Sequence, residues 1–242
     1  MNQVIQQLKE RKSVRVFTDR QIEPEAVSAI LEAAVNAPTA GNQQLYTIIH
    51  VTNPELKAQL AESCDHQPFI ATAPLVLVFC ADCRKWYQAF REYGCQPRQP
   101  GVGDLMLAVS DTNIAAQNAV VAAQSLGIGS CYIGDIMENA EQQRKLLSLP
   151  AYVFPAAMLV FGYPTTQQLE RPKPPRSQMR HIVHENGYRD MDAAELQQML
   201  SVNTGERGFP EWIQAFCDRK YNSDFSREMT RSVQVFLEDF QK

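Results

Sequence analysis

The chain of 242 residues is 45% hydrophobic and 21% charged, and its formal net charge is −4. This composition fits a globular protein with a buried core. The negative charge argues against nucleic acid or an anionic membrane as a partner, because both bind broad basic surfaces. The polar start of the chain and the lack of an apolar run of about 18 residues predict neither an export signal nor a membrane span. We therefore expect a cytoplasmic protein.

Apolar periodicity predicts helices, in chain order, at 2–11, 24–36, 54–62, 104–126, 138–147, 192–200, 209–218 and 224–240. Short runs rich in β-branched and aromatic residues predict strands at 45–51, 74–80, 130–133 and 155–162. About four strands mixed with helices favour a central sheet that is covered by helices on both faces.

The helix expected at 104–126 carries small and branched apolar residues on more than one face. Such a helix is buried on nearly all sides. In a domain of this size, that burial implies contact with a second subunit as well as with the sheet. The pattern therefore predicts a dimer.

The stretch at about 163–190 contains several prolines, which exclude a long helix or a central strand there. We expect an extended arm that wraps a surface, followed by a helical C-terminal region at about 191–242. No internal repeat and no clear boundary between domains is visible in the sequence. A single domain over 1–242 is therefore predicted.

The cysteines and histidines do not form a recognisable metal set. Cys80 and Cys83 have CxxC spacing, but Cys80 ends an apolar run and no second CxxC exists. His181 and His184 lack a third ligand at zinc spacing. We expect free thiols, hydrogen-bonded structural histidines and no metal site.

Known phosphate-binding and nucleophile motifs are absent from the sequence. GVGDLM (101–106) lacks the third glycine of a dinucleotide fingerprint, and neither GxxxxGK[ST] nor GxSxG occurs. Basic residues remain in two clusters, at Arg11, Lys12 and Arg15 and at Arg171, Lys173, Arg176 and Arg180. A phosphate monoester suits two or three such cations with a hydroxyl such as Ser13, although solvated basic loops explain the same composition.

An ordered set of segments resembles the nitroreductase family of FMN enzymes, most closely its NADPH-using nitroreductases and flavin reductases. The segments are RKSVRVF (11–17), NAPTAGNQQ (36–44), SDTNIAAQNAVVAAQSLGIGSCYIGDI (110–136), LVFGYPT (159–165) and PKPPR (172–176). The resemblance covers roughly 3–190. It implies an α+β fold of the nitroreductase type: a three-layer α-β-α sandwich with a mostly antiparallel central sheet, in an intertwined homodimer that binds FMN at its interface.

The resemblance implies two basic motifs that close on the FMN phosphate. Arg11, Lys12, Ser13 and Arg15 match the N-terminal motif, with Arg15 beside the N1 and C2 carbonyl edge of the flavin. Lys173 and Arg176 match the later basic motif. That motif reads KPPR where the family usually has KPR, so one proline displaces Arg176.

Three further segments are implied to contact the flavin ring. Pro38, Thr39, Ala40 and Asn42 match a loop that covers the flavin from the partner subunit. Gln67 matches a position at the pyrimidine edge, where an amide presents both a donor and an acceptor. Tyr132, Ile133 and Gly134 match the turn whose backbone N–H faces flavin N5. Asp135 stands where many close members have glycine, and Gln44 and Leu45 replace the Pro-Trp of some branches.

The resemblance implies ping-pong two-electron transfer from NAD(P)H through FMN to a nitroaromatic, a quinone or free flavin. No side chain is predicted as a catalytic acid or base. Arg207 lies where the NADPH-using subgroup carries an arginine for the 2′-phosphate, although a solvated loop arginine explains it equally. The alternatives are a flavin carrier or redox sensor without turnover, and a reductive specialist such as a dehalogenase or a flavin-fragmenting enzyme.

Overall fold

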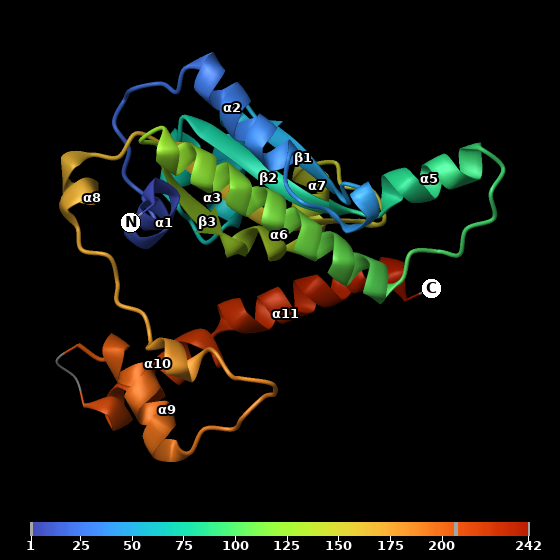
Figure 1. The fold of residues 1–242 in the computed structure, drawn as a ribbon. Helices are drawn as coiled ribbons and strands as arrows, with labels where there is room; N and C mark the ends of the chain where they lie inside the picture. Colours follow the sequence, from blue (N-terminus) through green and yellow to red (C-terminus); the bar gives the residue numbers. More distant parts are fainter. Residues whose placement is uncertain (1, 206–207, 242) are drawn as a thin grey trace. The chain divides into compact units, whose positions relative to one another are not determined.

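A computed structural model describes residues 2–205 and 208–241, so the expected NADPH residue Arg207 lies outside the described part. The chain forms two compact units. The first comprises residues 1–171 and 228–242, and the second comprises residues 172–227. The two units are drawn in Figure 1, and each is described by itself.

The first unit is built on one antiparallel sheet of four strands in the order β1-β2-β4-β3. The strands are β1 (Tyr46–Val51), β2 (Leu75–Asp82), β3 (Gly129–Ile133) and β4 (Val153–Gly162). Every residue of the two central strands, β2 and β4, is buried. Continuous apolar runs such as LVLVF in β2 are typical of strands that are covered on both faces.

Alternate side chains of the central strands divide the core into two layers. Leu77 and Leu159 pack with helices α2 (Pro24–Val35) and α6 (Val102–Ser125) on one face of the sheet. Val78 and Val160 pack on the other face with the helices α3 (Pro54–Ser63), α4 (Pro68–Thr72), α7 (Ala140–Leu146) and the end of α11 (Asp224–Leu237). Helices on both faces make the three layers that the sequence predicts, as Figure 1 shows.

The first unit contains further short elements. They are α1 (Gln3–Glu10), η1 (Ala40–Asn42), α5 (Arg84–Glu92), η2 (Gly134–Met137), α8 (Thr166–Glu170) and η5 (Glu238–Phe240). The second unit contains η3 (Met179–His181), α9 (Ala193–Leu200), η4 (Ser201–Asn203), α10 (Phe209–Lys220) and the start of α11. Within it, Trp212 stacks on Phe216 with ring centroids 5.0 Å apart.

The structure differs from the sequence expectations at several helices, among them α4, α5 and α8, which the sequence analysis does not predict. The proline-rich stretch contains the helix α8, because its five residues lie between Pro164 and Pro172 and are themselves free of proline. Helix α6 is not buried on all sides in the single chain. Met106, Leu107 and Ile114 are 60%, 45% and 41% exposed, and they follow one face of the helix. The described residues contain no helix long and apolar enough to cross a membrane.

Candidate functional site

The N-terminal basic motif lies along β3. The backbone N–H of Val14 donates to the carbonyl of Ser130 at 2.9 Å, and Ser13 forms a parallel bridge with Ser130. A few residues further on, the N–H of Thr18 donates to the carbonyl of Tyr163 at 2.8 Å. These bonds hold the motif beside the strand that leads to Tyr132, Ile133 and Gly134.

Two glycines permit this close approach. A Cβ added at Gly129 would lie 2.6 Å from the Val14 side chain, and one added at Gly162 would lie 2.6 Å from the Phe17 ring. Both distances are far shorter than a carbon–carbon contact of about 3.5 Å. Glycine is therefore required at both positions if residues 13–17 are to stay against the sheet.

The cations of the motif have different surroundings. The Lys12 ammonium donates to the carbonyl of Leu169 at 2.7 Å and to the carbonyl of Arg171. Arg171 in turn donates from Nη2 to the Ser13 carbonyl at 2.5 Å. The Nε of Arg11 is buried without a hydrogen-bond partner among the described residues. Lys12 and Arg171 thus fasten the motif to the end of α8, and Arg11 retains a donor for which residues 2–205 and 208–241 supply no acceptor.

The cations of the motif lower the pKa values of two β3 side chains, those of Cys131 and Tyr132, against the effect of burial. Burial raises the pKa of the Cys131 thiol, while the charges of Arg15 and Arg11 and hydrogen bonds from Ser13 and Arg15 oppose that rise. Burial likewise raises the pKa of Tyr132 to about 12, against the opposing charge of Arg11. Arg11 and Arg15 therefore place positive charge near the middle of β3, and Ser13 adds a neutral hydrogen-bonding group.

The expected pyrimidine-edge residue lies beside the expected N5 turn. Gln67 donates from Nε2 to the Cys64 carbonyl at 2.7 Å and to Asp135 Oδ2 at 3.1 Å. Both amide hydrogens are thereby used, and Oε1 remains as the group that can accept a hydrogen bond from a ring N–H. The turn η2 begins at Gly134, directly after β3, so Gln67, the turn and the basic motif form one contiguous region.

Asp111 of α6 holds the second expected flavin segment, the loop 38–45. Its carboxylate accepts from the Thr39 hydroxyl, from the Ala40 N–H at 3.1 Å and from the Leu45 N–H at 3.3 Å. It is only 3% exposed. A buried carboxylate on an otherwise apolar helix face is stable here because it satisfies three donors of one loop.

This loop keeps an unusual backbone. Gly41, Asn42 and Gln44 have φ values of 57°, 57° and 50°. Left-handed conformations cost energy for residues other than glycine and cluster at binding sites. The bonds to Asp111 hold this conformation.

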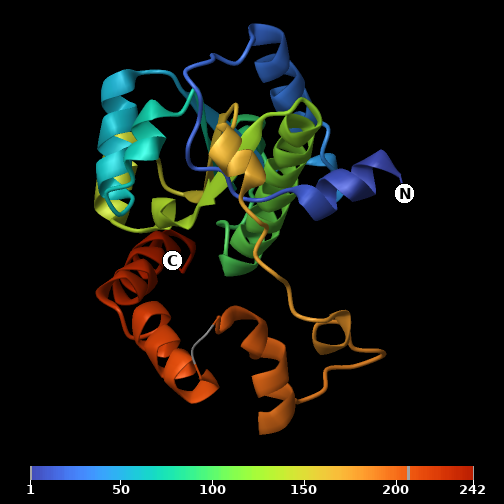
Figure 2. The same cartoon turned by 90° about the vertical axis from the view of Figure 1, so that its left-hand side faces the viewer.

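The loop and the basic motif are attached to different halves of α6. The loop is bonded to Asp111, whereas α1 and Arg11 lie against Gln117, Val120 and Gln124. Figure 2 shows α1 beside the C-terminal half of α6. Within one chain, therefore, the two predicted flavin-binding segments are not gathered at one point.

Lys173 and Arg176 belong to the second unit. The Arg176 guanidinium lies near its own backbone, 3.4 Å from the carbonyl oxygens of Pro174 and Pro175. Cys80 and Cys83 are buried free thiols, and burial raises the pKa of each to about 12. No group of three or more potential metal ligands occurs among residues 2–205 and 208–241.

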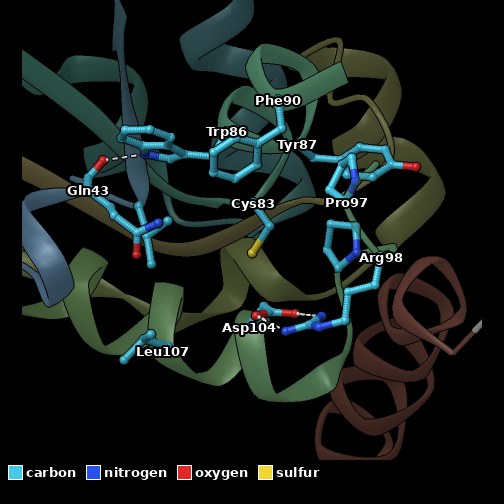
Figure 3. A pocket seen from close by; sticks show the side chains of 11 residues that line it. Gln43, Cys83, Trp86, Tyr87, Phe90, Pro97, Arg98, Asp104 and Leu107 are labelled. Atoms are coloured by element: carbon cyan, nitrogen blue, oxygen red, sulfur yellow. Dashed lines mark hydrogen bonds and ion pairs between the residues drawn. The ribbon is translucent and has the colours of Figure 1, made fainter. Parts of the chain in front are cut away.

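Sequence reasoning did not identify Asp111 or the fastening role of Arg171 as parts of the site. A carboxylate within an apolar helix pattern was a usable signal for Asp111. Sequence reasoning also did not identify a cavity of about 290 Å³ beside the loop 38–45, which Figure 3 shows. Its aromatic lining comes mainly from α5, an element that the sequence analysis did not predict.

The comparisons with known proteins agree with this geometry. The model of the nitroreductase family matches residues 8–163. An FMN reductase (NAD(P)H) of Bacillus subtilis is 30% identical over 240 residues, covering 98% of this chain and 92% of that protein. An oxygen-insensitive NADPH nitroreductase of Salmonella typhimurium is 35% identical over 193 residues, covering 79% of this chain and 77% of that protein. The chain belongs to the nitroreductase family.

The fold agrees as well. The crystal structure of nitroreductase A from Vibrio parahaemolyticus superimposes with a TM-score of 0.84 at 26% identity, covering all of both chains. The α+β architecture predicted from the sequence is confirmed.

Proposed function

We propose that the chain is an FMN-dependent oxidoreductase that takes electrons from NAD(P)H and passes them in pairs to a small electron-poor acceptor. The observation that supports this most directly is the contiguous region of the basic motif, β3, the turn at Gly134 and Gln67. It places donors for a phosphate, a backbone turn and an amide edge along one path, as a mononucleotide with a flat ring requires. Family membership supports the same assignment.

The residues fit FMN on their own chemistry. Arg11 has a buried Nε without a partner among the described residues, which a phosphate oxygen would satisfy. Ser13 adds a hydroxyl, and Lys173 and Arg176 are proposed to bind the same phosphate. Lys12 is proposed to act beside them while it fastens the motif to the Leu169 carbonyl. Gln67 Oε1 would accept from the flavin N3–H.

The ring itself is proposed to lie along Tyr132, Ile133 and Gly134, with Arg15 at its N1 and C2 carbonyl edge. FMN supplies the hydride chemistry at N5 when it is bound. The chain contributes binding, orientation and positive charge, and we assign no side chain as a catalytic acid or base. The backbone of the turn after β3 would orient the ring.

A homodimer would complete the site. Pro38, Thr39, Ala40 and Asn42 are held at the Asp111 half of α6, away from the basic motif of the same chain. We propose that this loop covers the FMN of the partner subunit, with α6 in the interface. We propose NADPH as the electron donor, because relatives are named for it, with Arg207 as the contact of its 2′-phosphate. We also propose that the enzyme acts in the cytoplasm.

The absorbance spectrum of the purified protein before and after anaerobic addition of NADPH tests this function. Flavin bands that bleach rapidly, and that return when menadione is added, are the expected result. A flavin that stays oxidised in the presence of both NADPH and NADH would contradict the reductase and favour a carrier. Protein that binds no FMN when it is added would contradict the cofactor.

A further inference from the structure

A cavity of about 290 Å³ opens between α5, the segment 97–100 and the start of α6. Three aromatic side chains of α5, those of Trp86, Tyr87 and Phe90, form most of one wall, as Figure 3 shows. Pro97, Pro100 and Leu107 also line the cavity. All these residues belong to the first unit. Concave sites of this aromatic composition are typical of small-molecule pockets.

The aromatic wall is held in place before any ligand binds. The indole N–H of Trp86 donates to the Gln43 carbonyl at 2.8 Å. The centroids of the Trp86 and Phe90 rings are 5.7 Å apart, and the Tyr87 ring meets the Tyr152 ring edge-on at 5.6 Å. Because these rings are fixed by neighbours, a ligand would not have to pay the ordering cost of mobile side chains.

The polar part of the cavity lining is an ion pair between Arg98 and Asp104. Arg98 donates two hydrogen bonds to Asp104, at 2.5 and 2.9 Å, and the Gly101 N–H donates to the same carboxylate at 2.8 Å. The guanidinium holds the pKa of Asp104 below its usual value, so the pair stays ionised and has no net charge. The lining therefore favours an uncharged ligand over an anion or a cation, and the outer N–H groups of Arg98 can donate to an oxygen at the rim.

The cavity adjoins the loop that is proposed to cover FMN. Gln43, which accepts the Trp86 hydrogen bond, directly follows Asn42 of that loop. Residues Gln43 and Leu45 are themselves part of the lining. A ligand in the cavity would thus lie next to the flavin-covering loop, and its affinity would depend on the same α5 rings that fix the loop.

We propose that this cavity binds the ring of the electron acceptor, an uncharged planar aromatic molecule of one or two rings with a carbonyl or nitro oxygen at the rim. The proposal rests on the proposed function and narrows its acceptor. Electron-poor rings stack favourably on the electron-rich faces of tryptophan and tyrosine. The volume lies at the lower end of ligand pockets, which suits a small quinone or nitroaromatic. A quinone bound there takes one hydride from the reduced cofactor and one proton from solvent, and it leaves as the hydroquinone.

Steady-state kinetics with 1,4-naphthoquinone test the pocket in the FMN-loaded protein. Phe90→Ala removes one ring of the wall, and we expect the KM for naphthoquinone to rise about five- to tenfold, the worth of one aromatic contact. The KM for ferricyanide, which has no ring to stack, should change far less. Tyr93→Ala is the matched control, because Tyr93 follows α5, is 87% exposed and does not line the cavity. If Phe90→Ala and Tyr93→Ala changed the KM for naphthoquinone by the same factor relative to the wild type, the proposal would be overturned.

A binding measurement without turnover provides the second arm. Trp86 and Trp212 are the two tryptophans of the chain, so Trp212→Phe leaves Trp86 as the single reporter. We expect naphthoquinone to quench its fluorescence to saturation, with a half-saturation concentration about five- to tenfold higher when Phe90→Ala is added. Quenching that rises linearly and equally in both proteins would contradict a site at α5. If NADPH fails to reduce the flavin at all, the proposed function fails, whereas saturable quenching would still support the pocket.

Discussion

Glu138 is a buried carboxyl four residues beyond the turn at Gly134. It is 6% exposed, and its Oε1 has no hydrogen-bond partner among the described residues. Burial, the largest cause, and the neighbouring charges of Asp135, Asp65 and Glu228 together raise its pKa to about 7. Of these neighbours, Glu228 is itself paired with Arg231 at 2.8 Å. Glu138 thus remains protonated well above the pH at which an exposed carboxyl ionises.

This shift predicts that stability falls as the pH rises. The folded pKa lies above the unfolded value of 4.5, so the folded chain binds more protons than the unfolded chain between those two values. We expect the free energy of unfolding to fall from about pH 5 to pH 8, by at most about 3 kcal/mol. Glu138→Gln should flatten this dependence in denaturant titrations. If the free energy of unfolding depended on pH with the same slope in Glu138→Gln and in the exposed control Glu92→Gln, the role of Glu138 would be contradicted.

Arg15 is the cation of the motif that is proposed to lie at the flavin N1 edge. It is exposed, and it forms no salt bridge within the described parts of the chain. Its backbone N–H lies 3.4 Å from Gln168 Oε1, and its charge opposes the rise of the Cys131 pKa. A fixed cation near N1 stabilises the reduced anionic flavin more than the oxidised ring.

We therefore expect Arg15→Gln to lower the flavin midpoint potential and to slow reduction by NADPH, while FMN stays bound through Arg11, Ser13 and Lys173. A redox titration against dyes of known potential measures this. An unchanged midpoint at full flavin occupancy would remove Arg15 from the mechanism. A variant that loses stability and keeps its potential would indicate a role in holding the N-terminal segment.

At the scale of elements, the pairing of residues 13–17 with the sheet depends on Gly129 and Gly162. We predict that Gly129→Ala destabilises the protein by about 1–3 kcal/mol, because the new Cβ would overlap Val14 and force the segment outward. FMN affinity should fall with it, since the segment carries Arg11 and Ser13. Thermal unfolding and FMN titration measure the two effects.

Gly103→Ala is the matched control for that substitution. Gly103 lies in α6, and a Cβ there would meet nothing within 4 Å. Helix propensity then favours alanine by about 1 kcal/mol. If Gly129→Ala were as stable as this control and bound FMN as well as the wild type, the close approach would not be required.

The strands were predictable because apolar β-branched runs bounded by prolines and glycines carry their own signal. Each predicted strand agrees with the structure within about two residues at either end. Helices α4 and α8 were missed because five residues do not establish a helical period. Helix α5 was missed because its sequence, RKWYQAFRE, is dominated by polar residues and has no buried residue.

The candidate site was predictable to a different degree. The segments around Arg11, Gln67 and Gly134 were identified by resemblance, and the structure places them in one region. Asp111 and the aromatic cavity depend on contacts between residues far apart in sequence, such as Trp86 with Gln43. No local period or motif encodes such contacts, so sequence reasoning alone could not identify the partners of these residues. For Asp111, the sequence shows only a carboxylate within an apolar helix pattern.

At the scale of the whole molecule, the exposed apolar face of α6 is the feature that a single chain leaves unexplained. Met106 and Ile114 are exposed about two turns apart, on the helix that carries both Asp111 and the surface against α1, whereas Leu107 lines the cavity. A second α6 packed on this face would bury these side chains. It would also bring the loop of one subunit towards the basic motif of the other.

We predict that Ile114→Lys weakens the dimer and, with it, FMN binding. A lysine ammonium buried in an apolar contact without a partner costs several kcal/mol, enough to shift association by orders of magnitude. Sedimentation velocity should show dimers for the wild type and monomers for Ile114→Lys, and FMN titration of the same samples should show the loss of affinity. Ala29→Lys is the control, because Ala29 is exposed on α2 and should leave the dimer intact. Monomeric wild-type protein that retains FMN would show that one chain suffices, and the loop 38–45 would then have no partner's flavin to cover.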